Sequence, residues 1–447
     1  MNLEDLASRV IELARAKGAT AAECTVSEGE HFSASVRLGE IESLKDAGSR
    51  GAGVRILNGK HTGSAYTSDL TDEGVAQMVN SALELAKITT EDPYAGLPDQ
   101  SELGKINDDL ALFSQSVPDL AASTKIEWAK RAEAAAMSAD PRITNSEGAS
   151  CDSHVGMTVF ANSLGFLGSY RTSSCSISAV PVAKENGSME RDFWFSVARS
   201  ADRLENPEDV GRKAAARALR RLGARKVSTQ KAPIIFEPRV ARSLLDNIFD
   251  AISGDSVYRG ETFLAGKLGQ QIAIPGLTVI DDATLPYLFG SSPFDDEGVP
   301  SRRTTVIENG VLKSWLLNSY TARKLGMKTT GNASRGITGN AGVGHGNFYI
   351  PNGNVTPENI IKSVKTGLYV TELIGFGINI VTGDYSRGAA GMWIENGEFA
   401  YPVSEITIAS TLQEMLMSIE AIGSDLEFRG ALAAPTLLIR EMTISGK

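Results

Sequence analysis

Histidine and cysteine are the side chains most often used to hold zinc, and no two histidines lie near each other in this sequence. A helical zinc site uses two histidines about one turn apart on the same face, so that both imidazoles reach one metal ion. The histidines are His31, His61, His154 and His345, and the cysteines are Cys24, Cys151 and Cys175. A Gly-x-Ser-x-Gly nucleophile motif is also absent. The sequence therefore predicts no local zinc motif and favours buried, structural roles for His154 and the three cysteines.

Carboxylates are the other candidates for chemistry. Asp246 and Asp250 are four residues apart and lie on one face of an expected helix, where they could act as an acid–base pair or bind a metal. Asp281-Asp282 and Asp295-Asp296-Glu297 could bind a hard cation such as calcium or magnesium. Neither group has the spacing of a known calcium loop, so we interpret all of them as solvated polar positions.

The glycine-rich segment 329–346 contains Gly342-Val343-Gly344-His345-Gly346, which has the composition of a phosphate loop. A phosphate loop needs a preceding strand and a following helix, and the sequence predicts neither of them here. We therefore expect a mobile loop that could cover a bound peptide, with Gly331, Asn332, Arg335 and His345 as its candidate contact residues.

Composition narrows the function further. The chain has 447 residues, a net charge of −10 and 42% hydrophobic residues, which is typical of globular domains and disfavours binding to nucleic acid. The basic cluster within 212–226 falls on an expected helix and is interpreted as a solvated face. There is no basic-then-apolar leader at the N-terminus and no apolar stretch of about 18 residues, so we expect a cytoplasmic protein without membrane contact. Three unclustered cysteines fit a reducing compartment.

The first half mixes helical and strand-like patterns. Asn2 and Thr71 are expected helix caps, a Thr124–Glu127 capping box is expected to open a third helix, and Asn58-Gly59 predicts a tight hairpin. The expected helices are 3–17, 71–87, 124–138 and 206–223, and the expected strands are 33–38, 41–45, 51–57, 62–66 and several within 153–197. A polar run follows the last helix, so we predict an N-terminal α/β domain at residues 1–230.

The second half is dominated by glycine and strand signals. Asn309-Gly310 and Asn396-Gly397 each predict a hairpin. The expected elements are a strand at 233–236, a helix with an apolar face over 240–252, short helices at 356–367 and 410–422, and a final strand at 435–444. The predicted fold class is α+β, with a β-rich, barrel-like or sandwich-like C-terminal domain at residues 231–447.

Several segments together resemble the TldD/PmbA family, and within it the PmbA (TldE) branch. The most specific are Glu91-Asp92-Pro93-Tyr94-Ala95-Gly96-Leu97-Pro98-Asp99 and the region from Leu317-Asn318-Ser319-Tyr320 to Thr330-Gly331-Asn332. The resemblance covers essentially the whole chain. It implies a two-subunit bacterial metallopeptidase, in which the TldD-type subunit binds zinc through a His-Glu-x-x-x-His helix and a cysteine nearer the C-terminus.

In this sequence the corresponding helix positions fall at Asp246, Asn247 and Ala251, and residues 425–447 contain no cysteine. Alanine cannot bind zinc and asparagine cannot act as a carboxylate base, so we carry over no catalytic residue and expect no metal or other cofactor in this chain. The resemblance implies that zinc is held by a TldD-type partner, where it activates water and polarises the scissile carbonyl.

The resulting hypothesis is a non-catalytic subunit that helps to hold extended, unfolded peptides, including peptide antibiotic precursors and antitoxins. The family's label as a modulator of DNA gyrase would then reflect downstream effects of proteolysis. Two alternatives stay open. One is a peptide-binding or regulatory homodimer, since such a subunit could self-associate when isolated. The other is a peptidase whose metal ligands come from distant residues such as His154 or His345.

Overall fold

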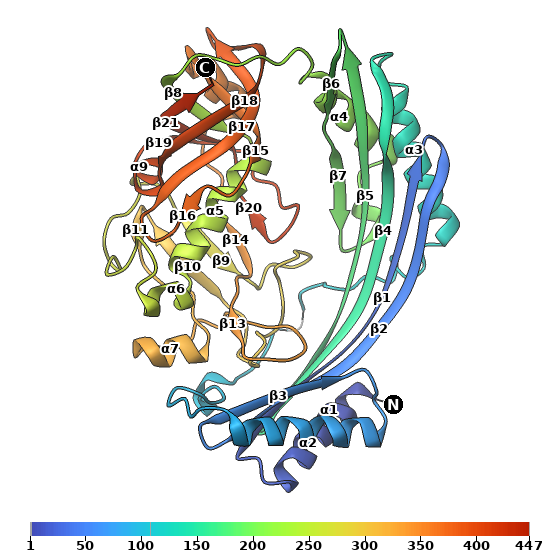
Figure 1. Cartoon of the computed structure of the whole chain (residues 1–447), viewed down its shortest axis with the longest axis vertical. Coiled ribbons are helices and arrows are strands. Elements are labelled where there is room, and N and C mark those ends of the chain that lie inside the picture. The colour runs from blue at the N-terminus through green and yellow to red at the C-terminus, as the bar shows by residue number, and fades with distance from the viewer. Residues whose placement is uncertain (1, 108, 447) are drawn as a thin grey trace.

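The computed structural model describes residues 2–107 and 109–446, and shows two bodies standing side by side (Figure 1). A long, curved sheet from the first half of the chain lies next to a β-rich domain from the second half. The mixed α and β content and the barrel described below confirm the predicted fold class. None of the helices in these two ranges has the length and apolar character needed to span a bilayer.

The N-terminal sheet is antiparallel and forms a half-barrel in the order β3-β2-β1-β4-β5-β6, with β7 also paired to β5. Its strands are β1 (Ala21–Arg37), β2 (Glu40–Asn58), β3 (His61–Thr67), β4 (Ile143–Asn162), β5 (Leu167–Glu185), β6 (Ser188–Arg191) and β7 (Trp194–Ala198). Strands β1, β2, β4 and β5 are the long ones, with 17 to 20 residues each, and run along much of the molecule (Figure 1).

Strand β2 is longer than the sequence predicts. Two strands were expected, at 41–45 and 51–57, but the structure has one continuous strand. Residues 51–57 are buried under helices, whereas residues 40–50 are mostly exposed and therefore polar. A strand is recognised in sequence by alternating apolar residues, and an exposed segment such as 40–50 does not need them. Sequence patterning therefore could not show that residues 40–50 continue the strand.

Helices cover the half-barrel on the side away from the C-terminal domain and at its lower end (Figure 1). They are α1 (Leu3–Ala16), α2 (Asp72–Ile88), α3 (Ala122–Met137) and α4 (Pro207–Leu219), with short 3-10 turns at Gln100–Glu102 and Ala201–Arg203. The predicted caps Asn2 and Thr71 are confirmed, since their side chains accept hydrogen bonds from backbone N–H groups of the first turn. The capping box at Thr124 is wrong: α3 begins two residues earlier, after Ala121, and Thr124 lies within its first turn.

The C-terminal domain contains a closed five-stranded barrel. Strand β15 pairs with both β8 and β17, which closes the order β15-β8-β21-β18-β17 into a ring, with β16 and β19 attached. The strands are β8 (Gln230–Phe236), β15 (Thr366–Ile374), β16 (Ile378–Asn379), β17 (Asp384–Glu395), β18 (Glu398–Thr411), β19 (Ile419–Ile422) and β21 (Leu437–Ser445).

A second sheet has the order β11-β10-β9-β14-β20, and helix α5 packs between it and the barrel with its apolar side in the domain core. The strands are β9 (Val279–Asp282), β10 (Arg303–Glu308), β11 (Val311–Leu312), β14 (Asn347–Tyr349) and β20 (Leu432–Ala433), beside a small pair, β12 (Ala333–Ser334) and β13 (Gly342–Val343). The helices are α5 (Pro238–Ile252), α6 (Gly254–Arg259), α7 (Ser319–Leu325), α8 (Pro357–Ser363) and α9 (Leu412–Met417).

Turn residues correctly predicted two hairpins of this domain, whereas the expected helix at 410–422 is only partly formed. Asn309-Gly310 and Asn396-Gly397 both have positive φ and connect β10 to β11 and β17 to β18, which confirms the two hairpins. The helix expected at 410–422 is wrong beyond Met417. Residues 419–422 instead pair with β21 as strand β19, which gives their isoleucines a cross-strand packing surface.

Candidate functional site

Two cavities lie between the two bodies, and the first residues of helix α5, Pro238, Arg239 and Arg242, line one of them. We call the region of these two cavities the cleft. The apolar side of α5 is buried in the C-terminal core, as the sequence pattern predicted. The three positions that the resemblance assigns to a metal site do not share one environment, because successive residues of a helix are separated by about 100° around its axis. Asp246 is exposed, whereas Asn247 and Ala251 point into the protein.

The two buried positions are already occupied by structural contacts. The side-chain amide of Asn247 donates a hydrogen bond to the carbonyl of Ser243 at 2.9 Å. Ala251 has no exposed surface, and its carbonyl accepts a hydrogen bond from the Thr262 hydroxyl at 2.7 Å. Alanine has no donor atom and the Asn247 side chain is buried and bonded within its own helix, so these residues do not fit a zinc site.

Acidic groups and one imidazole gather beside the exposed face of α5. The edge of the His345 ring packs on Phe249 with ring centroids 4.9 Å apart. Burial raises the pKa of Asp246 and of Asp250; for Asp250 the neighbouring Asp246 adds to the increase, while His345 opposes it in both. Within residues 2–107 and 109–446, no three His, Cys, Asp or Glu side chains are placed together as metal ligands.

The glycine-rich segment 329–346 is held in place by buried carboxylates. Asp281 accepts hydrogen bonds from the Asn332 side chain and from the backbone N–H of Gly346, both at 2.7 Å. Asp295 accepts from the backbone N–H of Ala333 at 2.9 Å. Burial raises the pKa of Asp281 to about 6, because the ionised form is poorly solvated there.

These contacts correct the interpretation of the acidic loops as solvated turns. Asp281, Asp282, Asp295 and Glu297 are all buried, and they accept hydrogen bonds from backbone N–H groups or neighbouring side chains. Burial and the nearby Glu297 raise the pKa of Asp295 well above its usual value. The acidic residues therefore anchor loops of the C-terminal domain, and their sequence spacing gave no sign of this.

Arg335 lies away from the cleft, in a contact between the two bodies. Its guanidinium is 2.6 Å from Glu23 on β1, and Arg55 on β2 contacts the same carboxylate oxygen at 2.9 Å. All three side chains are buried. Burial acts to raise the pKa of Glu23, but Arg335 and Arg55 outweigh that effect and the pKa is lower than usual. This ionic triad, Glu23 with Arg55 and Arg335, ties the glycine-rich segment to the half-barrel.

The other three predicted loop residues come together at one cavity. Gly331, Asn332 and His345 line a space of about 390 Å³, whose opposite wall is formed by Tyr170 on β5 and by Arg199 just after β7. The cavity thus lies between the half-barrel and the C-terminal domain. His345 donates from Nδ1 to the Gly346 carbonyl at 2.8 Å, which fixes the orientation of the ring. His154 is on β4, opposite His31 in the β1–β4 register, as expected for a strand residue.

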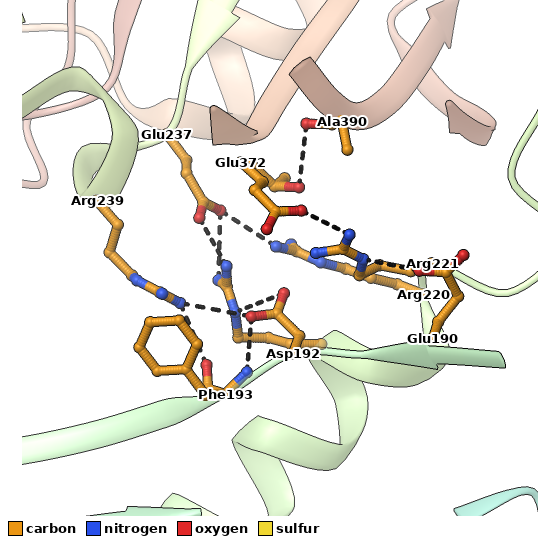
Figure 2. A network of polar contacts seen from close by, with 11 residues as sticks. Glu190, Asp192, Phe193, Arg220, Arg221, Glu237, Arg239, Glu372 and Ala390 are labelled. Carbon is orange, nitrogen blue, oxygen red and sulfur yellow. Dashed lines mark hydrogen bonds and ion pairs between the residues drawn. The ribbon is translucent and has the colours of Figure 1, made fainter. Parts of the chain in front are cut away.

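A second polar network joins the two bodies near the start of α5 (Figure 2). Glu237 contacts Arg217 at 2.8 Å and Arg220 at 3.2 Å, while Arg221 contacts Glu372 at 2.6 Å. The interpretation of the basic cluster within 212–226 as a solvated face is therefore wrong for these three arginines, which pair with carboxylates of the C-terminal domain. Residues far apart in sequence form the network, so no local pattern indicated it.

A cavity of about 120 Å³ opens beside this network. Arg239 lies over the Phe193 ring at 4.1 Å, and Arg429 lies over Trp194 at 4.3 Å. Burial and the neighbouring Arg217 lower the pKa of Arg239 to about 10. Strand β20 is the last strand of its sheet, and both of its residues, Leu432 and Ala433, line the cavity. The cleft thus has an arginine-rich and aromatic upper end and a polar lower end, with α5 between them.

Comparisons with known proteins agree with this architecture. Three family models match successive segments: PmbA/TldA metallopeptidase domain 1 at residues 22–86, the central domain at 116–222 and the C-terminal domain at 229–446. The chain is 43% identical over 445 residues to metalloprotease PmbA of Escherichia coli O157:H7, covering 100% of this chain and 96% of that protein. It is 39% identical to a metalloprotease PmbA homolog of Haemophilus influenzae, covering 99% and 96% of the two chains.

The fold is also similar to the crystal structure of a protein from Bacteroides thetaiotaomicron that is described as a modulator of DNA gyrase. The TM-score is 0.92 at 26% sequence identity, and the match covers 99% of both chains. Three family models in sequence order and a relative of 43% identity that spans the whole chain show the relationship directly. This protein belongs to the PmbA/TldD family of metallopeptidases.

Proposed function

We propose that this chain is the non-catalytic, substrate-holding subunit of a two-subunit zinc metallopeptidase, and that hydrolysis takes place in a TldD-type partner. The observation that carries the proposal is that the motif positions on helix α5 do not fit a zinc site. Of the three positions that a His-Glu-x-x-x-His motif would occupy, Asn247 is bonded within its own helix and Ala251 is enclosed in the core. Asp246 alone is exposed.

The cleft supports a role in holding peptides. An extended peptide carries unpaired backbone groups, and the open edge of a strand can bind them with little dependence on sequence. Strand β20 is an edge strand of its sheet and lines the upper cavity together with Trp194 and Phe195. Unfolded peptides and small proteins are the substrates that such an edge would accept, among them the peptide antibiotic precursors and antitoxins named above.

The test is a peptidase assay on an unfolded protein such as reduced, alkylated casein, with this chain alone, the TldD-type protein of the same organism alone, and the two mixed. We expect cleavage only in the mixture, and about one zinc per heterodimer. An Asp246→Ala variant of this chain should retain that activity, because the proposal gives Asp246 no part in catalysis. Cleavage by this chain alone, together with about one tightly bound zinc per chain, would overturn the proposal.

A regulatory or peptide-binding homodimer is the alternative in a different class. Co-purification from the native host separates the two. Recovery with a TldD-type chain supports the peptidase subunit, and recovery as a homodimer without such a chain supports the alternative.

A further inference from the structure

The cavity between β5 and the glycine-rich segment contains a buried cation that has no acidic partner. Arg199 is 8% exposed, and its guanidinium lines the wall that faces Asn332 and His345. Within the described residues, no carboxylate lies at ion-pair distance from Arg199, and its Nε has no hydrogen-bond partner. A buried cation without a counter-ion is costly, so an unpaired arginine beside a cavity points to an anionic ligand.

The contacts of Arg199 fix its position but leave part of its donor capacity unused. Nη1 donates to the Ser173 carbonyl, and Nη2 donates to the carbonyls of Leu288 and Phe289, each at 3.3 Å. These bonds are long compared with the usual 2.9–3.0 Å of an N–H···O bond. The guanidinium also packs over the Phe289 ring at 4.8 Å. These contacts use three of the five N–H donors of the guanidinium, and Nε is enclosed, so Nη1 keeps one donor that can bind a carboxylate without displacing them.

The other side chains that line the cavity indicate which type of anion would bind to Arg199. Thr172 lines the same cavity with a hydroxyl that can donate a further hydrogen bond. Asp295 and Asp296 line it as well, and would repel a dianion such as phosphate. Asp295 directs both of its oxygens to backbone N–H groups, and Asp296 accepts from the N–H of Arg335 at 2.8 Å. A single unpaired arginine balances one negative charge and the two acids disfavour a second one, so the site fits a monoanion better than a dianion.

We propose that Arg199 and Thr172 form a carboxylate-binding site at the lower end of the cleft, which takes the C-terminal carboxylate or an acidic side chain of a bound peptide. That the ligand is a peptide rests on the proposed function. The cavity lies beyond His345, at the lower end of α5, where an extended peptide running down the cleft from the arginine-rich end would arrive.

The test uses the full chain without a partner and three N-acetylated alanine pentapeptides, with binding followed by calorimetry. One peptide has a free C-terminal carboxylate, one a C-terminal amide, and one a C-terminal amide with a central glutamate. We expect the free acid to bind about tenfold more tightly than the plain amide, because a hydrogen bond to a charged group is among the stronger kinds. If the glutamate peptide binds like the free acid, the site accepts acidic side chains; if it binds like the amide, the site is specific for the terminus.

Arg199→Met should remove the preference for the free acid. The matched control is Arg203→Met, which removes an exposed arginine that packs over Tyr287 outside the cavity and should leave the preference unchanged. Equal binding of all three peptides to the unmodified chain, no binding of the free acid at millimolar concentration, or a preference that survives in Arg199→Met would each overturn the proposal. The peptidase assay above is independent of these results, so the two proposals can fail separately.

Discussion

Replacing Glu23 with glutamine tests whether the ionic triad holds the two bodies together. Glu23 is 1% exposed, and its Oε1 accepts from Arg55 and Arg335 at 2.9 and 2.6 Å. Glutamine preserves the shape and the accepting oxygen but removes the negative charge. The two buried arginines then lose their nearest counter-ion and keep only the more distant charges of Asp296 and Glu297. Breaking a buried ion pair on one side costs about 3–5 kcal/mol, and we expect Glu23→Gln to lower the free energy of unfolding by that amount.

Urea unfolding followed by tryptophan fluorescence measures this change, because Trp128 and Trp194 report on the first half of the chain and Trp315 and Trp393 on the second. A second readout is trypsin cleavage after Arg335, which is protected by burial in the native protein and should become fast in the variant.

The matched control for the triad is Glu84→Gln, which removes an exposed ion pair with Lys87 and should cost less than about 1 kcal/mol. If Glu23→Gln lowers stability no more than this control does, and Arg335 stays protected from trypsin, the triad does not couple the two bodies and the reasoning is refuted.

Two further predictions concern the anchoring of the glycine-rich segment. Burial raises the pKa of Asp281 to about 6 from the ordinary 3.8, so the folded state binds the proton more tightly and stability falls as pH rises through this range, by about 3 kcal/mol in all. Asp281→Asn should abolish this contribution, so urea unfolding at pH 4 and pH 7 should show a smaller decrease in the variant; an identical decrease would contradict the assignment. A Cβ on Gly53 would lie 1.7 Å from the Ile337 carbonyl oxygen, so Gly53→Ala should destabilise the protein by about 1–3 kcal/mol. Gly48→Ala is its control, since a Cβ there meets nothing closer than 4.0 Å, and equal thermal stability of the two variants would show that Ile337 moves away freely.

Sequence patterning predicted the features that depend on neighbouring residues. The hairpin at Asn309-Gly310 needs only two residues that tolerate positive φ, and the apolar stripe of α5 needs only the helical period. The resemblance located the degenerate motif in the sequence. Whether its residues are buried and what they bond to depends on packing, which only the structure describes.

The polar contacts between the bodies could not be predicted in this way. Glu23 and Arg335 are separated by 312 positions, and each is unremarkable in its own segment. The same holds for Arg199, whose unpaired state depends on which carbonyls and acids surround it in three dimensions. A charged residue is buried only where partners compensate its charge, and here those partners come from distant parts of the chain. Sequence patterning therefore could not identify the buried charges.

The two ionic clusters also decide how a peptide reaches the cleft. The triad at Glu23 fixes the lower end of the half-barrel to the C-terminal domain, and Glu237 with Arg217 and Arg220 fixes the upper end. Separating the bodies would break both clusters at once, together with the contacts that surround them. A peptide that binds with millimolar to micromolar affinity supplies only about 4–8 kcal/mol, and any such separation would consume part of it. We therefore expect a peptide to enter along a cleft that is already formed, with β20 at one end and Arg199 at the other in place before it binds.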